Sequence, residues 1–282
     1  MASLTSKTSL RVSSSWMIKS HDIKIGKVIG HGSFGIVYKG VLNGMDVAIK
    51  KVGASASTKE KATAAHMLQR EVKALSHCRH KNIVQLIGAC SNPPMLVLAY
   101  AAKGTLRDLL QKDNYFFPPS SKLKLLRGIC DGMIMLHSKK VLHLDLKPEN
   151  VLISADDCPW VADFGLAVAM TATLTSSAGS TKGGRGTMQY KAPEHFIVPV
   201  NDSDSNSDSD ESEQRETKTS PKLTYDKPAD VYSFAMICWE LFSGTGKVPF
   251  AGKSMAYIST MHINALNGGK PKRPKTKTIP KE

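Results

Sequence analysis

One short segment constrains this chain more than any other: His143-Leu144-Asp145-Leu146-Lys147-Pro148-Glu149-Asn150, which Asp163-Phe164-Gly165 follows. An aspartate, a lysine two residues on and an asparagine five residues on can form one loop that handles a phosphoryl group. In such a loop Asp145 orients the proton of an attacking hydroxyl, and Lys147 contacts the phosphate. Asn150 and Asp163 are the candidates for holding a metal ion. The two motifs together predict a phosphoryl-transfer site.

A glycine-rich run lies upstream, Ile29-Gly30-His31-Gly32-Ser33-Phe34-Gly35-Ile36-Val37. Glycines let a backbone fold closely over phosphates because no side chain blocks the approach. A G-x-G-x-x-G pattern alone could equally open the helix of a Rossmann domain. The flanking residues 23–29 and 36–41 both have the pattern of strands, so we expect the glycines to join a hairpin.

Lys50 ends the segment Val47-Ala48-Ile49-Lys50, and we expect it to contact the phosphates of a nucleotide. Its ammonium needs an acidic partner that holds it in place. Residues 59–76 have the apolar periodicity of a helix and contain two candidates, Glu60 and Glu71. Glu60 lies close to the expected start of this helix, which disfavours it.

These motifs occur in order and at compatible spacing, and together they resemble the active-site segments of eukaryotic-type protein kinases. The resemblance runs from about Asp22 to Pro274 and implies an α+β fold with two lobes. We expect a small β-rich lobe with the hinge over 22–101 and a larger helical lobe over 102–282. The best match is the tyrosine-kinase-like group, which includes Raf-like and mixed-lineage kinases. Lys147 and residues 186–194 point to serine or threonine as the acceptor.

The resemblance implies ATP and Mg²⁺ as cofactors and Glu71 as the partner of Lys50. It also implies which side chains sandwich adenine, which residue is the gatekeeper before the hinge, and which backbone groups bond adenine. Val37, Ala48 and Leu152 are the residues that sandwich adenine. Leu98 is the gatekeeper, and Ala99 to Ala101 offer the backbone groups. The full set around the nucleotide is Ile29, Gly30, Gly32, Ser33, Phe34, Gly35, Val37, Ala48, Lys50, Glu71, Leu98, Ala99, Ala101 and Leu152.

His143 could be interpreted as a general base, but the resemblance makes it structural. It fits the regulatory spine of the family, which is a stack of packed side chains. An aspartate at the start of a buried helix anchors this spine. The spine residues are Leu75, Leu86, His143 and Phe164, and the anchor is Asp230.

Several features depart from the family pattern. Leu144 replaces the arginine that usually precedes the catalytic aspartate. Residues 201–220 are rich in aspartate and serine, which predicts a disordered insert, and residues 1–21 predict a flexible leader. The family continues with further helices beyond the position of Glu282, so we expect a truncated large lobe in which Glu194 lacks its usual arginine partner.

Composition narrows the remaining classes. No apolar run approaches the length of a membrane span, and five scattered cysteines form no C-x-x-C pair or zinc spacing. These features predict reduced thiols and a cytoplasmic location. The net charge of +14 is spread over much of the chain, so nucleic acid is disfavoured as a partner. A basic cluster over 270–277 leaves a nuclear-import patch as an alternative.

We therefore expect a Ser/Thr kinase that acts on protein substrates, with regulation by a dimer or another partner left open. Two alternatives stand beside it. One is a pseudokinase or scaffold module whose nucleotide pocket is regulatory. The other is a small-molecule phosphotransferase of the same fold, which the Ala192-Pro193-Glu194 segment disfavours because it resembles a peptide-docking feature.

Overall fold

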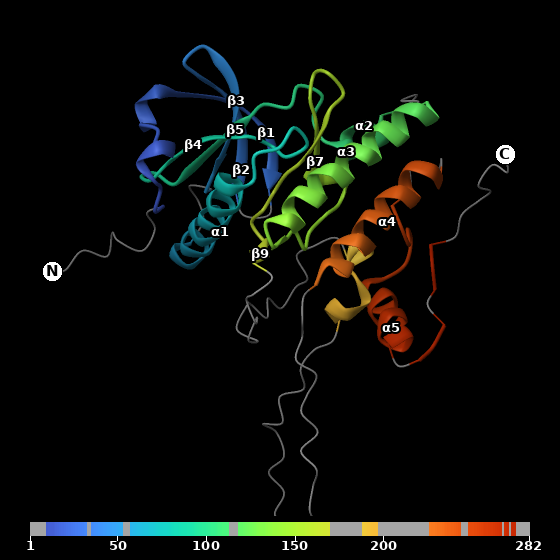
Figure 1. The fold of residues 1–282 in the computed structure, drawn as a ribbon. Helices are drawn as coiled ribbons and strands as arrows, with labels where there is room; N and C mark the ends of the chain where they lie inside the picture. The colour runs from blue at the N-terminus through green and yellow to red at the C-terminus, as the bar shows by residue number, and fades with distance from the viewer. Residues whose placement is uncertain are drawn as a thin grey trace, which may run out of the picture.

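The computed structural model describes residues 10–32, 35–52, 57–112, 118–169, 188–196, 226–243, 248–266, 268–270 and 272–274. These residues form a sheet with one long helix, followed by a mainly helical part (Figure 1). This arrangement confirms the predicted two-lobed α+β plan. The predicted insert over 201–220 lies outside the described residues.

The small lobe is built on an antiparallel five-stranded sheet with the order β1-β2-β3-β5-β4. Its strands are β1 (Ile23–Gly32), β2 (Gly35–Leu42), β3 (Met45–Lys51), β4 (Leu86–Cys90) and β5 (Met95–Ala99). β1 and β2 pair directly, with Gly30 opposite Val37. The glycine-rich run therefore joins a hairpin as predicted, and the Rossmann alternative is wrong.

Helix α1 (Thr58–His77) is the predicted helix of the small lobe, within one residue at each end. A capping box starts it: the Ser57 hydroxyl accepts from the Glu60 amide, and the Glu60 carboxylate accepts from the Ser57 amide at 2.9 Å. Its buried positions recur with helical spacing and turn one face toward the sheet. They are Ala64, Ala65, Leu68, Glu71, Val72 and Leu75.

Residues 10–22 differ from the flexible leader that we expected, because they pack on the small lobe. They contain two short 3₁₀ turns, η2 (Ser14–Trp16) and η3 (Ser20–Asp22). Leu10 is only 3% exposed and joins the main apolar cluster, and Trp16 packs against the same cluster. A few apolar residues within a Ser/Lys-rich sequence therefore order this segment. Residues 1–9 lie outside the described part.

The large lobe contains helices α2 (Leu106–Gln111), α3 (Pro119–Ser138), α4 (Lys227–Ser243) and α5 (Met255–Leu266). Two short strand pairs frame the loop that carries the predicted chemistry. They are β6 (Val141–Leu142) with β9 (Val168–Ala169), and β7 (Val151–Ile153) with β8 (Pro159–Val161). Three 3₁₀ turns complete the described part: η4 (Pro148–Asn150), η5 (Met188–Tyr190) and η6 (Pro193–Phe196).

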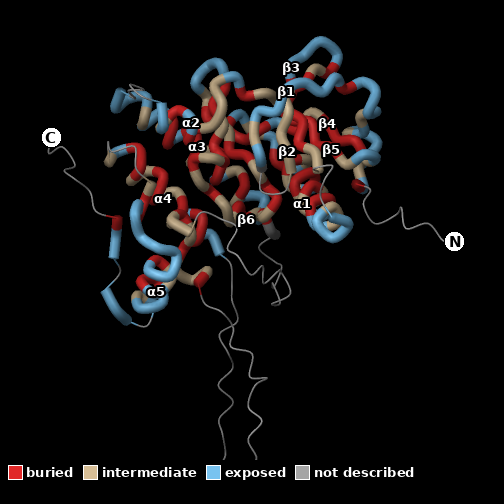
Figure 2. Tube along the Cα trace, turned by 180° about the vertical axis from the view of Figure 1, so that it is seen from behind, coloured by how far each residue is buried: buried red, intermediate tan, exposed pale blue. Residues whose placement is uncertain are grey.

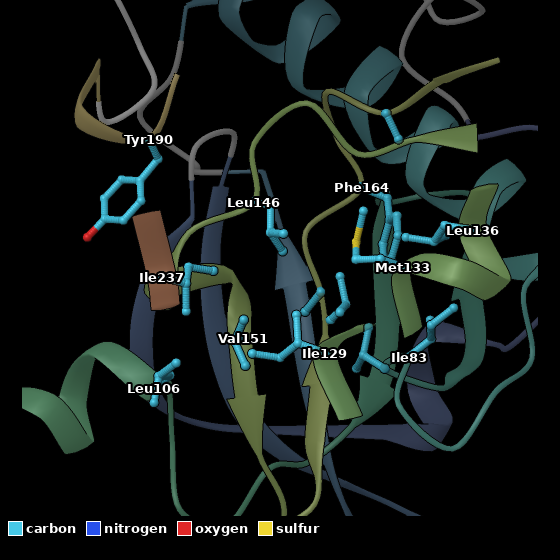
Figure 3. Packing of buried hydrophobic residues seen from close by; sticks show 14 of the residues in the cluster. Ile83, Leu106, Ile129, Met133, Leu136, Leu146, Val151, Phe164, Tyr190 and Ile237 are labelled. Atoms are coloured by element: carbon cyan, nitrogen blue, oxygen red, sulfur yellow. The ribbon is translucent and has the colours of Figure 1, made fainter. Parts of the chain in front are cut away.

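A single apolar cluster continues from the small lobe into the large lobe, and buried segments follow it through the molecule (Figure 2). Leu75 and Leu86 contribute from α1 and β4, and Ile129 and Ile237 contribute from α3 and α4. Figure 3 shows Phe164 beside α3 residues within this cluster. Phe164 is fully buried, so the residue after Asp163 is fixed by packing. Among the described residues, no helix has the length and apolar character that crossing a bilayer would need.

Candidate active site

Lys50 on β3 lies between two carboxylates from different parts of the fold. Its Nζ is 2.7 Å from Oε2 of Glu71 on α1 and 2.7 Å from Oδ1 of Asp163, which follows β8. Lys50 is 4% exposed and Glu71 is 1% exposed. The predicted contact between Lys50 and Glu71 is therefore present, whereas Glu60 caps the start of α1.

Burial and charge act in opposite directions on these three groups. Burial lowers the pKa of Lys50, but the charges of Glu71 and Asp163 outweigh this effect and raise the pKa above its usual value. Burial also raises the pKa of Glu71, and the Lys50 ammonium opposes it without fully cancelling it. For Asp163 the attraction to Lys50 outweighs burial, so its pKa is lowered. The attraction between Lys50 and Asp163 thus favours the charged forms of both groups.

The loop between β6 and β7 brings Asp145, Lys147 and Asn150 together. Lys147 Nζ lies 2.9 Å from Oδ2 of Asp145. The side-chain amide of Asn150 donates to the same Oδ2 at 3.0 Å and to the Asp145 carbonyl at 2.7 Å. Both side-chain bonds to Asp145 use Oδ2, so Oδ1 is the oxygen placed to orient a hydroxyl. Burial raises the pKa of Asp145, although the neighbouring Lys147 charge opposes the shift.

His143 is held by its backbone surroundings through both ring nitrogens. Nε2 donates to the Ala162 carbonyl at 2.9 Å, and Nδ1 accepts from the Asp145 amide at 3.2 Å. The ring is fully buried and lies 5.2 Å from the ring of Phe164. Because both nitrogens are engaged, this geometry supports the predicted structural role and not that of a general base.

Asp230, at the start of α4, fixes the backbone that precedes Asp145. Its carboxylate accepts from the amide of His143 at 3.0 Å and from the amide of Leu144 at 2.8 Å. His137 Nε2 lies 2.8 Å from the same carboxylate. Burial raises the pKa of Asp230, but the His137 bond and these amides outweigh burial and lower it. The predicted anchoring contact is therefore present.

Asn150 and Asp163 have the donor chemistry that a Mg²⁺ ion bound to phosphates requires. Both amide hydrogens of Asn150 bond to Asp145, so the side-chain oxygen of Asn150 remains available as a metal ligand. Asp163 accepts a hydrogen bond from Lys50 through Oδ1, and its other carboxylate oxygen remains available for a metal ion. Mg²⁺ typically takes one or two protein oxygens together with phosphate oxygens and water, so this small oxygen-only set fits it. The described residues contain no larger His, Cys, Asp or Glu cluster that could hold a metal alone.

Most of the predicted nucleotide-binding residues lie on β1, β2, β3 and β5; Glu71 lies on α1, Ala101 follows β5, and Leu152 lies on β7 of the large lobe. Ala48 pairs with Leu98 in the sheet, and Val37 pairs with Lys50. Val37 and Leu152 both pack against the cluster that contains Ala48. Ile29, Gly30 and Gly32 lie on β1 and Gly35 begins β2, whereas Ser33 and Phe34 lie outside the described residues.

The hinge refines one expectation. The Ala99 amide already donates to the Gln85 carbonyl at 3.0 Å, so Ala99 can offer adenine only its carbonyl. The Ala101 carbonyl accepts from the Gly104 amide at 3.2 Å, whereas the Ala101 amide makes no backbone bond within the described residues and can donate to a ligand. On β1, a Cβ atom at Gly30 would meet no protein atom within 4 Å. Packing inside the protein therefore gives no reason for a glycine at that position.

Sequence reasoning missed a buried network around Arg107 of α2. Its guanidinium bonds to Glu149 at 2.9 Å and to the Tyr190 hydroxyl at 2.5 Å, and it pairs with Glu240. Burial lowers the pKa of Arg107, but these acceptors outweigh burial and raise it. No local pattern links four residues so far apart in the sequence; the only signal was that Arg107 lies among leucines of α2.

The sequence analysis expected Glu194 to lack its usual arginine partner. Within the described part no salt bridge involves Glu194.

A family model described as "Protein kinase domain" matches residues 23–282. This match covers most of the chain, so the chain belongs to the protein kinase domain family. The prediction made from the loop and glycine-rich motifs is therefore confirmed at the level of the family.

Curated relatives agree with this assignment. The chain is 34% identical over 91% of its length to a putative serine/threonine-protein kinase/receptor (R831) of Acanthamoeba polyphaga mimivirus, and 34% identical over 83% to the serine/threonine-protein kinase STY46 of Arabidopsis thaliana. It is 29% identical over 97% to the inactive tyrosine-protein kinase kin-32 of Caenorhabditis elegans. The chain spans 14%, 35% and 28% of the lengths of these three relatives.

Proposed function

We propose that this chain transfers a phosphoryl group from ATP to serine or threonine hydroxyls of proteins, with Mg²⁺ as the metal. The observation that carries the proposal is the position of Lys50 between Glu71 and Asp163, beside the loop of Asp145. A cation held by two carboxylates is prepared to bind phosphates, and the loop supplies the groups that a hydroxyl acceptor needs.

Each residue has a role that its geometry permits. When bound, ATP supplies the transferable phosphoryl group and Mg²⁺ balances its negative charge. Lys50 binds and orients the phosphates, and Asn150 and Asp163 hold the metal through their remaining oxygens. Asp145 orients the acceptor hydroxyl through Oδ1, and Lys147, which bonds to Asp145, supplies a positive charge for the phosphate. Because the transition state of phosphoryl transfer is loose, positioning accounts for most of the catalysis.

The choice of serine or threonine rests on Lys147 and on the resemblance of residues 186–194 to Ser/Thr kinases. The rival function is a pseudokinase that binds nucleotide without transferring phosphate, and one relative is named as inactive. The complete set of Lys50, Glu71, Asp145, Asn150 and Asp163 favours the active enzyme.

The test is phosphate transfer from radiolabelled Mg-ATP to a peptide library with serine, threonine or tyrosine acceptors. The wild-type chain should label serine and threonine peptides. Asp145→Asn should lower the rate by about 10²- to 10⁴-fold, the usual contribution of a positioned acid–base group. Nucleotide binding without transfer in the wild type would favour the pseudokinase, and labelling of tyrosine alone would contradict the proposed acceptor.

A further inference from the structure

We propose that residues 10–18, which we call the N-terminal strap, hold α1 in the position that keeps Glu71 beside Lys50. Leu10, Gln69 and Gly88 are then positioning residues for the phosphoryl-transfer site, although none of them touches its reacting groups. The catalytic consequence rests on the function proposed above. The contacts that carry the inference concern only the strap, α1, β4 and the residues that directly follow these two elements.

The first contact joins the strap to α1 through Gln69. Its side-chain oxygen accepts from the Arg11 amide at 2.6 Å, and its side-chain nitrogen donates to the Arg11 carbonyl at 2.8 Å. One amide thus pairs with both backbone groups of a single residue, as a neighbouring strand would. Gln69 and Glu71 are two residues apart, and two residues turn an α-helix by about 200°. The strap therefore holds the side of α1 opposite to the one that carries Glu71.

The second set of contacts joins the strap to the sheet. The Leu10 amide donates to the Ser91 carbonyl at 3.3 Å, and the Ile18 amide donates to the Ala89 carbonyl at 3.0 Å. Met17 also forms a parallel bridge with Ala89. The Leu10 side chain is itself buried in the main apolar cluster. The strap consequently links β4 to α1 at both the backbone and the side-chain level.

Gly88 on β4 shows how closely the strap approaches the sheet. A Cβ atom at this position would lie 2.3 Å from Cδ1 of Ile18 and 2.8 Å from the Trp16 carbonyl oxygen. Such distances cannot occur, so any other residue at position 88 would push the strap away. Gly88 does not have a positive φ, so the backbone itself would accept alanine. The absence of a side chain at position 88 is therefore matched to the strap.

A third contact lies just beyond the end of α1. The guanidinium of Arg79 lies 4.9 Å from the centre of the Trp16 ring. Together with the Gln69 contact, this cation–π pair attaches the strap at two places along the direction of α1. An outward movement of α1 would have to break both attachments, and the same movement would separate Glu71 from Lys50.

The test uses the full chain with Gln69→Ala or Gly88→Ala and measures hydrogen exchange of α1 without nucleotide. Each variant should exchange the amides of residues 64–72 roughly five- to tenfold faster, the effect expected for the loss of one or two net hydrogen bonds. Alanine favours helix at least as well as glutamine, so faster exchange in Gln69→Ala cannot come from helix propensity. Lys50 should also react faster with an amine-selective acylating reagent, because its partner is held less firmly.

Lys73→Ala is the matched control, because Lys73 is exposed one turn further along the same side of α1. It should change neither exchange nor Lys50 labelling. Gln69→Glu should fall between wild type and Gln69→Ala, since it keeps the acceptor for Arg11 but loses the donor. Unchanged hydrogen exchange in both Gln69→Ala and Gly88→Ala would overturn the inference. Equally faster exchange throughout β1–β3 would also overturn it. These readouts need no phosphate transfer, so they test the strap even if the proposed kinase activity is absent.

Discussion

The ammonium of Lys50 lies 2.7 Å from the carboxylate of Asp163, although the two residues are 113 positions apart in the sequence. This contact joins β3 of the small lobe to the segment after β8 of the large lobe. Asp163 has a φ of 62°, a left-handed conformation that costs energy for a residue other than glycine. The buried Phe164 and the pairing with Lys50 hold it there. The position of Asp163 therefore depends on both lobes.

Replacing Lys50 should affect stability as well as activity. Lys50→Met leaves Glu71 buried without its cation, which should cost about 3–5 kcal/mol in free energy of unfolding and abolish phosphate transfer. Adding Glu71→Gln should recover part of the stability but none of the activity, because the buried charge is gone while the phosphate ligand is still missing. Urea unfolding and peptide phosphorylation measure the two effects. Lys51→Met, a change at the neighbouring position, is the control, and equal losses in it would contradict this account.

Asp163→Asn should separate metal binding from folding. The amide keeps one oxygen but removes the negative charge that attracts both Lys50 and a divalent cation. We expect ATP affinity in the presence of Mg²⁺ to fall by at least about tenfold, whereas affinity without metal should change much less. Isothermal titration with and without Mg²⁺ gives both values. A similar loss of affinity in the two conditions would show that Asp163 does not act through a metal.

Local patterns in the sequence predicted the elements but not the contacts between distant ones. Helix α1 was predicted almost to the residue because its apolar periodicity is a local property of the sequence. The Arg107 network was missed because Arg107 lies on α2 and its partners come from η4, η5 and α4. The packing of residues 10–18 was missed for a different reason. Its composition is typical of a disordered leader, and a few apolar residues such as Leu10 outweigh that composition only when a matching surface exists.

Asp230 should be sensitive even to a substitution that preserves its shape. Asp230→Asn places an amide donor where the carboxylate now accepts from His143, Leu144 and His137. Leaving buried donors unsatisfied should cost about 2–4 kcal/mol of unfolding free energy, and the freed backbone should lower phosphate transfer. Asp157→Asn is the control, because the exposed pair of Asp157 with Lys103 should contribute less than about 1 kcal/mol. A stable and fully active Asp230→Asn protein would rule out the anchoring role.

His195 in η6 predicts a loss of stability in mild acid. Burial and the Lys191 charge lower its pKa from 6.5 to about 4, and Asp230 opposes the shift only weakly. The folded chain therefore favours neutral His195, and between these values the unfolded chain binds more protons. The resulting stability is present above pH 6.5 and is lost as the pH falls toward 4, by at most about 3 kcal/mol. Melting curves of His195→Gln should show a shallower slope over this range than wild type. The same slope in both proteins would exclude His195 as the cause.

Leu144 leads to a prediction about regulation. In many kinases the arginine at this position forms a salt bridge with a phosphorylated residue of the activation loop, and this pair orders the loop. Leu144 has no side-chain donor, and its amide is used by Asp230 at 2.8 Å. Coupling to a phosphate therefore cannot run through position 144. The hydroxyl-rich loop over 170–187 lies outside the described residues, so the prediction rests on Leu144 alone.

We expect activity to be controlled by a partner, a dimer or expression level more than by phosphorylation of this loop. Treatment of the purified chain with phosphatase should change its rate on a peptide by less than about twofold, because the usual charge pair cannot form. Leu144→Arg should make the rate sensitive to the same treatment; the φ of 62° at this position suits arginine as well as leucine, since neither is β-branched. If phosphatase removed most of the wild-type activity, and rephosphorylation at a mapped loop site restored it, another residue would have to supply the missing charge and the prediction would be wrong.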